Sequence, residues 1–146
     1  MIYLGADHRG FKLKAEIKLW LEKWGFKFED FGAFTFDPED DYPDFIRLVA
    51  TAVAGDPEIN RGIILGGSGQ GEAMVANRFK GVRAAVFYGG EIEIIRLSRE
   101  HNNANILSLG ANFIEEETAR VAIWLWLQTP FSQEERHTRR IEKIDL

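Results

Sequence analysis

The chain of 146 residues is 45% hydrophobic and 28% charged, which is typical of a globular protein with one sizeable core. Eighteen basic and 23 acidic residues give a net charge of −5, so there is no overall electrostatic attraction to nucleic acid or to anionic membranes. The absence of cysteine excludes disulfides, thiolate nucleophiles and cysteine-ligated metals.

No segment of the sequence is typical of export or of membrane insertion. Residues 1–5 have the pattern of a strand and not of a signal peptide. No apolar run approaches the roughly 20 residues that span a bilayer. We therefore expect one cytoplasmic domain over residues 1–146, with no nucleic-acid or membrane partner.

Strand-like and helix-like segments alternate along the chain. Apolar runs predict strands at residues 1–5, 26–29, 62–65, 82–87 and 105–110. Helical periodicity predicts helices at residues 13–24, 43–55, 72–78, 91–100 and 115–128, and a charged helix at 133–144. Gly25 fits the end of the first helix. Short links between the segments favour an α/β fold, with a parallel sheet covered by helices on both faces.

Polar residues follow three of the predicted strands. In open parallel sheets, ligands bind outside the C-terminal ends of the strands. Asp7 and His8 follow the first strand, residues 66–72 follow the third, and Asn112 follows the fifth. The pair His101 and Asn102 precedes the fifth strand, and the sequence leaves open whether it reaches the same edge.

Residues 66–71 form a glycine-rich loop, Gly-Gly-Ser-Gly-Gln-Gly, between a strand and a helix. Four glycines in six residues let several backbone N–H groups converge on one ligand. The loop does not match the dinucleotide-binding pattern, and it lacks the Lys and Ser/Thr of a P-loop. Glu72 stands at its exit and would repel a phosphate. A tight strand-to-helix turn without a ligand is the plainer alternative.

Backbone donors beside a carboxylate suit one kind of chemistry, the removal of a proton from carbon while charge grows on an adjacent oxygen. The loop would stabilise an enediolate oxyanion, and Glu72 would accept the proton. Such a base needs burial to raise its pKa against the effect of the helix N-terminus. Alternatively, Glu72 is only a favourable first-turn residue.

The remaining candidate groups are histidines and arginines. The three histidines lack metal-ligand spacing, so we expect no metal site. His101 ends a helix, where the dipole favours its protonated form and suits a proton donor. Arg136 and Arg140, at i and i+4, could clasp a dianion. The alternatives are a surface or capping histidine and a solvated helix end paired with nearby glutamates.

Five segments carry a resemblance to a known family: YLGADHRG, DYPDF, GIILGGSGQGEAMVANR, SREHNNANIL and TPF…RHTRRIEKI. In order and along nearly the whole chain, they resemble the ribose-5-phosphate isomerase type B family, which includes subunits of galactose-6-phosphate isomerase. The resemblance implies a Rossmann-like three-layer α/β/α sandwich with a five-stranded parallel sheet. It further implies a homodimer or homotetramer with sites at the subunit interface, and interconversion of ribose 5-phosphate and ribulose 5-phosphate without metal or cofactor.

The same resemblance implies residue roles. One branch of the family uses a cysteine as base at the position of Gly66, whereas this sequence matches the branch with a glutamate base, Glu72. By that match the catalytic residues are Glu72, His101, which opens the sugar ring, and Ser68. The substrate-binding residues are Asp7, His8, Gly67, Ser68, Gly69, Gln70, Gly71, Asn102, Asn112, Arg136, His137 and Arg140.

Two departures from the family pattern leave the identity of the substrate undecided. Asn112 stands where the family usually has a phosphate-binding arginine, and the turn at residues 88–91 is longer than usual. Arg9 is a candidate for the missing charge. The alternatives are an isomerase of another sugar or sugar phosphate, such as a hexose 6-phosphate, and a non-catalytic sugar-phosphate-binding protein. A dinucleotide-binding module is a third and more distant alternative.

Overall fold

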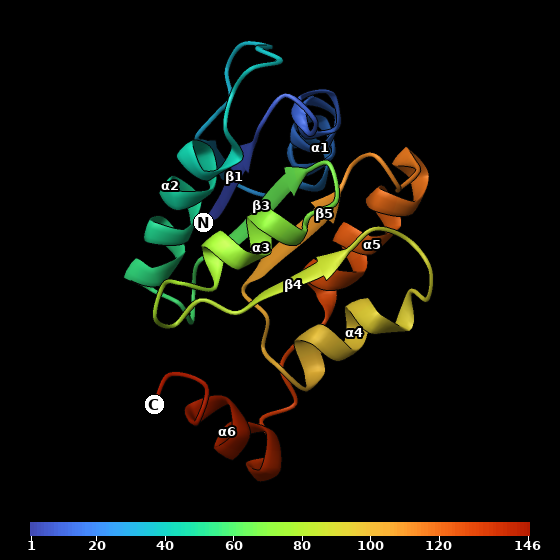
Figure 1. Ribbon diagram of the computed structural model, residues 1–146. Helices are drawn as coiled ribbons and strands as arrows, with labels where there is room; N and C mark the ends of the chain where they lie inside the picture. Colours follow the sequence, from blue (N-terminus) through green and yellow to red (C-terminus); the bar gives the residue numbers. More distant parts are fainter.

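The fold is built on a parallel sheet with the strand order β2-β1-β3-β5-β4 (Figure 1). The computed structural model describes residues 1–146. Its strands are β1 (Ile2–Ala6), β2 (Phe28–Asp30), β3 (Arg61–Gly66), β4 (Ala84–Phe87) and β5 (Ile106–Gly110). The predicted five-stranded parallel sheet is confirmed.

Helices cover both faces of the sheet, which gives the predicted three-layer sandwich. They are α1 (Phe11–Trp24), α2 (Tyr42–Gly55), α3 (Gln70–Ala76), α4 (Glu93–Glu100), α5 (Glu116–Gln128) and α6 (Glu135–Glu142). None is both long and apolar enough to cross a membrane. Successive side chains of β3 enter opposite layers: Ile63 and Leu65 pack in the core beneath α1 and α5, and Ile64 packs with α2.

Some element boundaries differ from the predicted ones for local reasons. The edge strand β2 begins at Phe28 because Gly25 and Phe26 cap α1: Gly25 is left-handed, with a φ of 82°, and the Phe26 N–H donates to Leu21 O. Helix α6 cannot begin at Gln133, whose φ is 60°. Helix α3 begins at Gln70, two residues before the predicted start, so Glu72 lies within its first turn.

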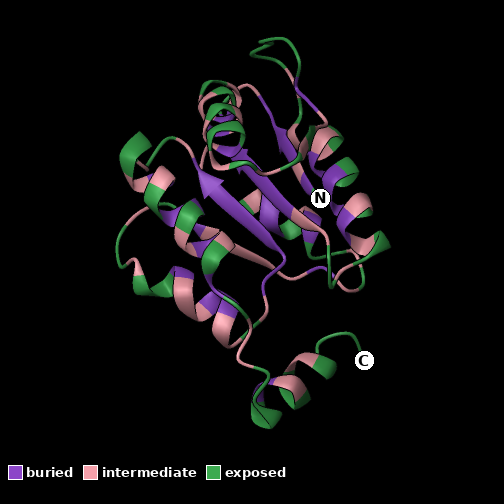
Figure 2. Ribbon diagram, turned by 180° about the vertical axis from the view of Figure 1, so that it is seen from behind, coloured by how far each residue is buried: buried purple, intermediate pink, exposed green.

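Helix α6 lies beyond the N-terminal ends of the strands, apart from the sheet (Figure 1). Figure 2 shows that the central strands β1, β3 and β5 are almost wholly buried whereas α6 is largely exposed. Only His137 of this helix is buried. Its ring stacks on that of His101, with centroids 4.3 Å apart and an interplanar angle of 15°. Beyond the helix, the Asp145 carboxylate accepts a 2.9 Å hydrogen bond from the Gly81 N–H.

Candidate active site

The Glu72 carboxylate lies directly over the end of β3. Glu72 is only 4% exposed to solvent. A Cβ built on Gly66 would overlap this carboxylate, so any side chain at position 66 would displace it. Glycine at position 66 therefore allows Glu72 to point back from α3 onto the strand end.

Burial changes the protonation of this group. The pKa of Glu72 is raised, chiefly because burial disfavours the charged form, and the negative charge of Asp7 adds to the effect. Hydrogen bonding to the backbone of Glu72 and Gly69 opposes the shift. Burial thus outweighs these hydrogen bonds, which is the condition that a general base at this position has to meet. A carboxylate with a raised pKa is a better base than an ordinary glutamate.

The glycine-rich loop is tied to the neighbouring strand. Gly69 is left-handed, with a φ of 78°, and its carbonyl accepts a 2.6 Å hydrogen bond from Ser108 Oγ, an interaction that sequence patterns did not indicate. The Gln70 N–H donates to Ser68 Oγ over 3.3 Å. The N–H groups of Gly67 and Ser68 form no hydrogen bonds within the protein. Two donors next to Glu72 thus remain available for an anionic oxygen.

Asp7 and His8 lie beside this loop, because β1 pairs with β3 in register up to Ala6 and Leu65. Asp7 is 5% exposed, and its Oδ1 accepts the Arg9 N–H over 2.9 Å. Burial raises the pKa of Asp7. Both buried carboxylates therefore stand at the same edge of the sheet, as predicted.

His8 is oriented by Asp40, a residue that no sequence motif indicated. Asp40 Oδ1 accepts the His8 backbone N–H over 3.0 Å and lies 2.6 Å from Nδ1 of the ring. An ionised carboxylate only accepts hydrogen bonds, so this contact places a proton on Nδ1 and leaves Nε2 for a ligand. The signal was weak, since Asp40 lies 32 residues away in an acidic loop.

Asp7, His8 and Asp40 are also the group best placed to hold a cation. One ligand atom from each lies within 4.8 Å of the others. One oxygen of each carboxylate already accepts a backbone N–H. The expectation of a site without metal stays a prediction.

Asn112 and Tyr42 also lie at this end of the sheet, beside the C-terminal ends of the strands. The Asn112 amide nitrogen is 3.1 Å from the position of a Cβ on Gly67, and its backbone N–H donates to Gly67 O over 3.0 Å. Tyr42 Oη lies 2.6 Å from the corresponding position on Gly71. Tyr42 begins α2, and its place beside the loop was not foreseen from its sequence context.

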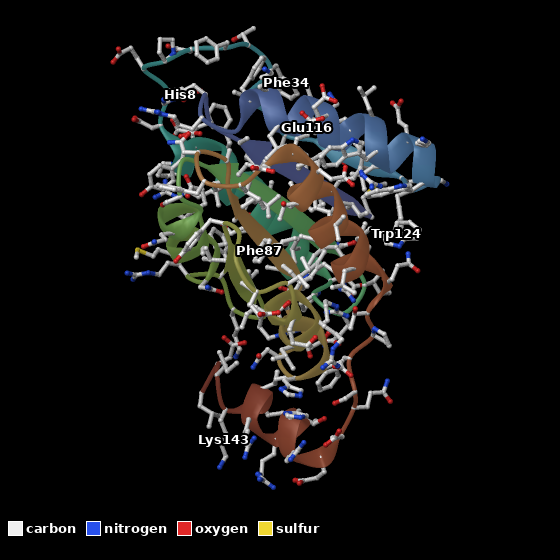
Figure 3. The ribbon with its side chains drawn as sticks, turned by 90° about the vertical axis from the view of Figure 1, so that its right-hand side faces the viewer. His8, Phe34, Phe87, Glu116, Trp124 and Lys143 are labelled. Atoms are coloured by element: carbon white, nitrogen blue, oxygen red, sulfur yellow. The ribbon has the colours of Figure 1, made fainter.

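The other predicted site residues gather at the opposite end of the sheet. His101 caps α4, which runs back from the C-terminal end of β4. The following turn returns to the start of β4, where the Asn105 N–H donates to Arg83 O over 3.0 Å. Asn102 lines a cavity of about 360 Å³ at this end. His8 lies at one end of the molecule in Figure 3 and Lys143, just after α6, at the other.

Helix α6 supplies the cationic residues of this second cluster. The pKa of His137 is lowered by burial and by the nearby His101 and Arg136. Its Nε2 is buried without a hydrogen-bond partner. Arg136 pairs at 3.0 Å with the exposed Glu134, a weak contact, so the paired alternative is realised in part. Arg140 is exposed and forms no ion pair with the protein.

Within this one chain, the predicted site is therefore divided into two clusters. The base cluster comprises Asp7, His8, Gly67, Ser68, Gly69, Gln70, Gly71, Glu72 and Asn112. The cationic cluster comprises His101, Asn102, Arg136, His137 and Arg140. The base cluster lies at the C-terminal ends of the strands and the cationic cluster at the N-terminal ends (Figures 1 and 3).

Comparison with known proteins places this arrangement in a family. The family model described as Ribose/Galactose Isomerase matches residues 2–144. Ribose-5-phosphate isomerase B of Mycolicibacterium paratuberculosis is 42% identical over 141 residues, covering 97% of this chain and 87% of that protein. Ribose-5-phosphate isomerase B of Escherichia coli is 38% identical, covering 98% of this chain and 93% of its own length.

Solved structures agree with the sequence comparison. The crystal structure of ribose-5-phosphate isomerase B from Mycoplasma genitalium with bound ribulose-5-phosphate has a TM-score of 0.93 and 38% identity, covering 98% of this chain and 92% of that one. The Clostridium thermocellum ribose-5-phosphate isomerase B has a TM-score of 0.91 and 41% identity, covering 99% and 94%. The chain belongs to the Ribose/Galactose Isomerase family.

Proposed function

We propose that this protein is a cytoplasmic isomerase that interconverts ribose 5-phosphate and ribulose 5-phosphate, with residues 1–146 as its single domain. The supporting observation is the buried Glu72 carboxylate, set beside the free N–H groups of Gly67 and Ser68. Relatives over nearly the full length are ribose-5-phosphate isomerases B, one of them with ribulose-5-phosphate bound.

The reaction proceeds through an enediolate. Glu72 removes the proton from C2 of the open-chain aldose and returns it to C1, while a proton moves from the C2 hydroxyl to the C1 oxygen. Negative charge grows on the C1 oxygen when the C2 proton leaves. The N–H groups of Gly67 and Ser68 and the Ser68 hydroxyl donate to that oxygen. No metal or organic cofactor takes part.

The rest of the site comes from a second copy of the chain. His101, which opens the sugar ring, lies at the opposite end of the subunit from Glu72, and so do Arg136 and Arg140, which hold the phosphate with His137 beside them. In a homodimer, or in a homotetramer built from such dimers, α6 of one subunit extends to the base cluster of another. Asp7, His8 and Asn102 then bind the sugar hydroxyls.

A mixed dimer tests the shared site. One subunit of the mixed dimer has Glu72→Gln and the other has His101→Asn. Each subunit has a different affinity tag, and purification through both tags in turn isolates the mixed dimer. One of the two sites then contains both native residues and the other contains neither. We expect about half of the wild-type activity, because the symmetric dimer has two equivalent sites.

The two parent homodimers are the controls. Each should be strongly impaired because every site lacks one group. A mixed dimer that is no more active than its parents would contradict a site shared between subunits. Native mass spectrometry of the purified sample verifies its composition.

A substrate panel tests the reaction itself. We expect the highest kcat/KM for ribose 5-phosphate among ribose 5-phosphate, allose 6-phosphate, galactose 6-phosphate and the free sugars, measured by NMR at equal enzyme concentration. A preference for a hexose 6-phosphate or for an unphosphorylated sugar would favour the alternative that Asn112 suggests. Measurable binding without any turnover would favour a non-catalytic homologue, which the buried position of Glu72 speaks against.

A further inference from the structure

Arg9 lies over the same glycine as Asn112. A Cβ on Gly67 would be 3.1 Å from Asn112 Nδ2 and 3.8 Å from Arg9 Cγ. The backbone N–H of Arg9 donates to the buried Asp7 carboxylate over 2.9 Å, which fixes the point from which the side chain departs. The two side chains thus flank the loop that leads to Glu72, and they follow β1 and β5, the two strands that pair with β3.

The Arg9 guanidinium is exposed, and it forms no hydrogen bond or ion pair with the protein. Two lysines of α1 are engaged elsewhere: Lys14 Nζ contacts Asp30 at 2.7 Å and Lys18 Nζ contacts it at 2.9 Å. Arg9 therefore has a full positive charge available for a ligand. Lys12, one turn further on, lines the same hollow of about 260 Å³ as Arg9.

The edge around Arg9 is acidic. Asp7, Asp40 and Glu72 all place carboxylates there, and burial raises the pKa of Asp7 and of Glu72. A phosphate dianion that enters this edge is repelled by the ionised carboxylates. The Asn112 amide can donate a hydrogen bond but carries no charge. Arg136 and Arg140 come from the other subunit, so Arg9 is the cation of the same subunit that can offset this repulsion next to the glycine-rich loop.

We propose that Arg9 binds the phosphate of the substrate, beside Asn112 and opposite Arg136 and Arg140 of the second subunit, and so sets the preference for phosphorylated sugars. A guanidinium can donate two parallel hydrogen bonds to a phosphate, which a single amide cannot match. This inference rests on the proposed isomerase function, because it assigns a residue to that site.

The test compares Arg9→Ala with the wild type. We expect the KM for ribose 5-phosphate and the Ki of inorganic phosphate to rise about 10- to 100-fold, the loss typical of a charged hydrogen bond. The kcat should change little, because the chemistry at Glu72 is untouched, and activity on unphosphorylated ribose should not fall. Arg9→Lys should recover part of the lost phosphate affinity, since lysine keeps the positive charge but lacks the planar guanidinium that donates two parallel hydrogen bonds.

Two further variants sharpen the comparison. Lys12→Ala removes the same charge from the same hollow and should leave KM and Ki unchanged. The double variant Arg9→Ala/Asn112→Arg should recover phosphate affinity, because residue 112 lies over the same glycine. A KM and a Ki that are equal in Arg9→Ala and the wild type would overturn the proposal, and so would an equal loss in Lys12→Ala.

Calorimetry with inorganic phosphate separates this proposal from the proposed function. If the wild type did not isomerise ribose 5-phosphate, the function would fail, but phosphate binding to the wild type and its loss in Arg9→Ala would still support the role of Arg9. Absence of phosphate binding to the wild type, or equal binding to both proteins, would overturn that role even in an active isomerase.

Discussion

Replacing Glu72 by glutamine is expected to lower kcat for ribose 5-phosphate by about 10²- to 10⁴-fold, the usual contribution of a general base. Glutamine has nearly the shape of glutamate, so it can keep the position over Gly66 but cannot accept the proton. The measurement is the initial rate of ribulose 5-phosphate formation. Glu22→Gln, which changes an exposed carboxylate near the C-terminal end of α1, is the control and should retain full activity.

The dependence on pH gives a second readout for Glu72. Folding raises its pKa, so the folded state binds the proton more tightly than the unfolded state does. The stability that this preference contributes is fully present below the unfolded pKa and is lost as the pH rises through the folded pKa. Ionised Glu72 therefore destabilises the protein near neutrality.

The glutamine variant should consequently have a higher Tm than the wild type at about pH 8, and the difference should shrink toward about pH 4. The wild-type kcat should also decline on the acid side at a pH above the ordinary glutamate pKa of 4.5. A variant that keeps more than about a tenth of the wild-type kcat would contradict the role of Glu72 as base, given the usual size of that effect.

Substitution of Gly66 by alanine should impair the enzyme without touching any reacting group. The added Cβ would occupy the place of the Glu72 carboxylate, which must then turn away from the strand end. A displacement of about 1 Å can cost about 10² in rate, so we expect at least this loss in kcat. The measurement is the same isomerase assay, together with a thermal melt that reports on folding.

Gly55→Ala is the matched control for this change. Gly55 is the last residue of α2, and a Cβ there would meet no atom within 4 Å. Alanine is the better helix former, so this variant should be fully active and at least as stable. If Gly66→Ala were as active as Gly55→Ala, the tight packing of Glu72 on the strand end would not matter for catalysis.

The elements of the fold could be predicted because their signals are local. Gly25 ends α1 as expected, and the apolar run at β3 and the glycines behind it place a turn and a helix. The order of the strands could not be predicted. It depends on contacts between distant segments, such as the pairing of Ile2 with both Phe28 and Arg61.

The candidate site could be predicted in part for the same reason. Glu72 and its loop are contiguous in sequence, so their chemistry can be inferred from this one segment. The division into two clusters was left open, although the short link between His101 and β5 was a usable signal: it requires the end of α4 to lie near the start of that strand. Asp40 had no such signal because it reaches the site from a loop, whereas Tyr42 lies in the segment DYPDF, whose resemblance to the family did not indicate a place beside the glycine-rich loop.

The close packing of Glu72 on Gly66 has a consequence for how such sites evolve. In the branch of the family that this sequence does not match, the resemblance implies a cysteine base at position 66, and that cysteine would need the space that the Glu72 carboxylate fills. On this backbone the cysteine and the proposed glutamate base exclude each other. If positions 66 and 72 change one at a time, the intermediate protein has either both bases, which clash, or neither of them. Positions 66 and 72 should therefore show strong epistasis, and each residue is acceptable only with its own partner.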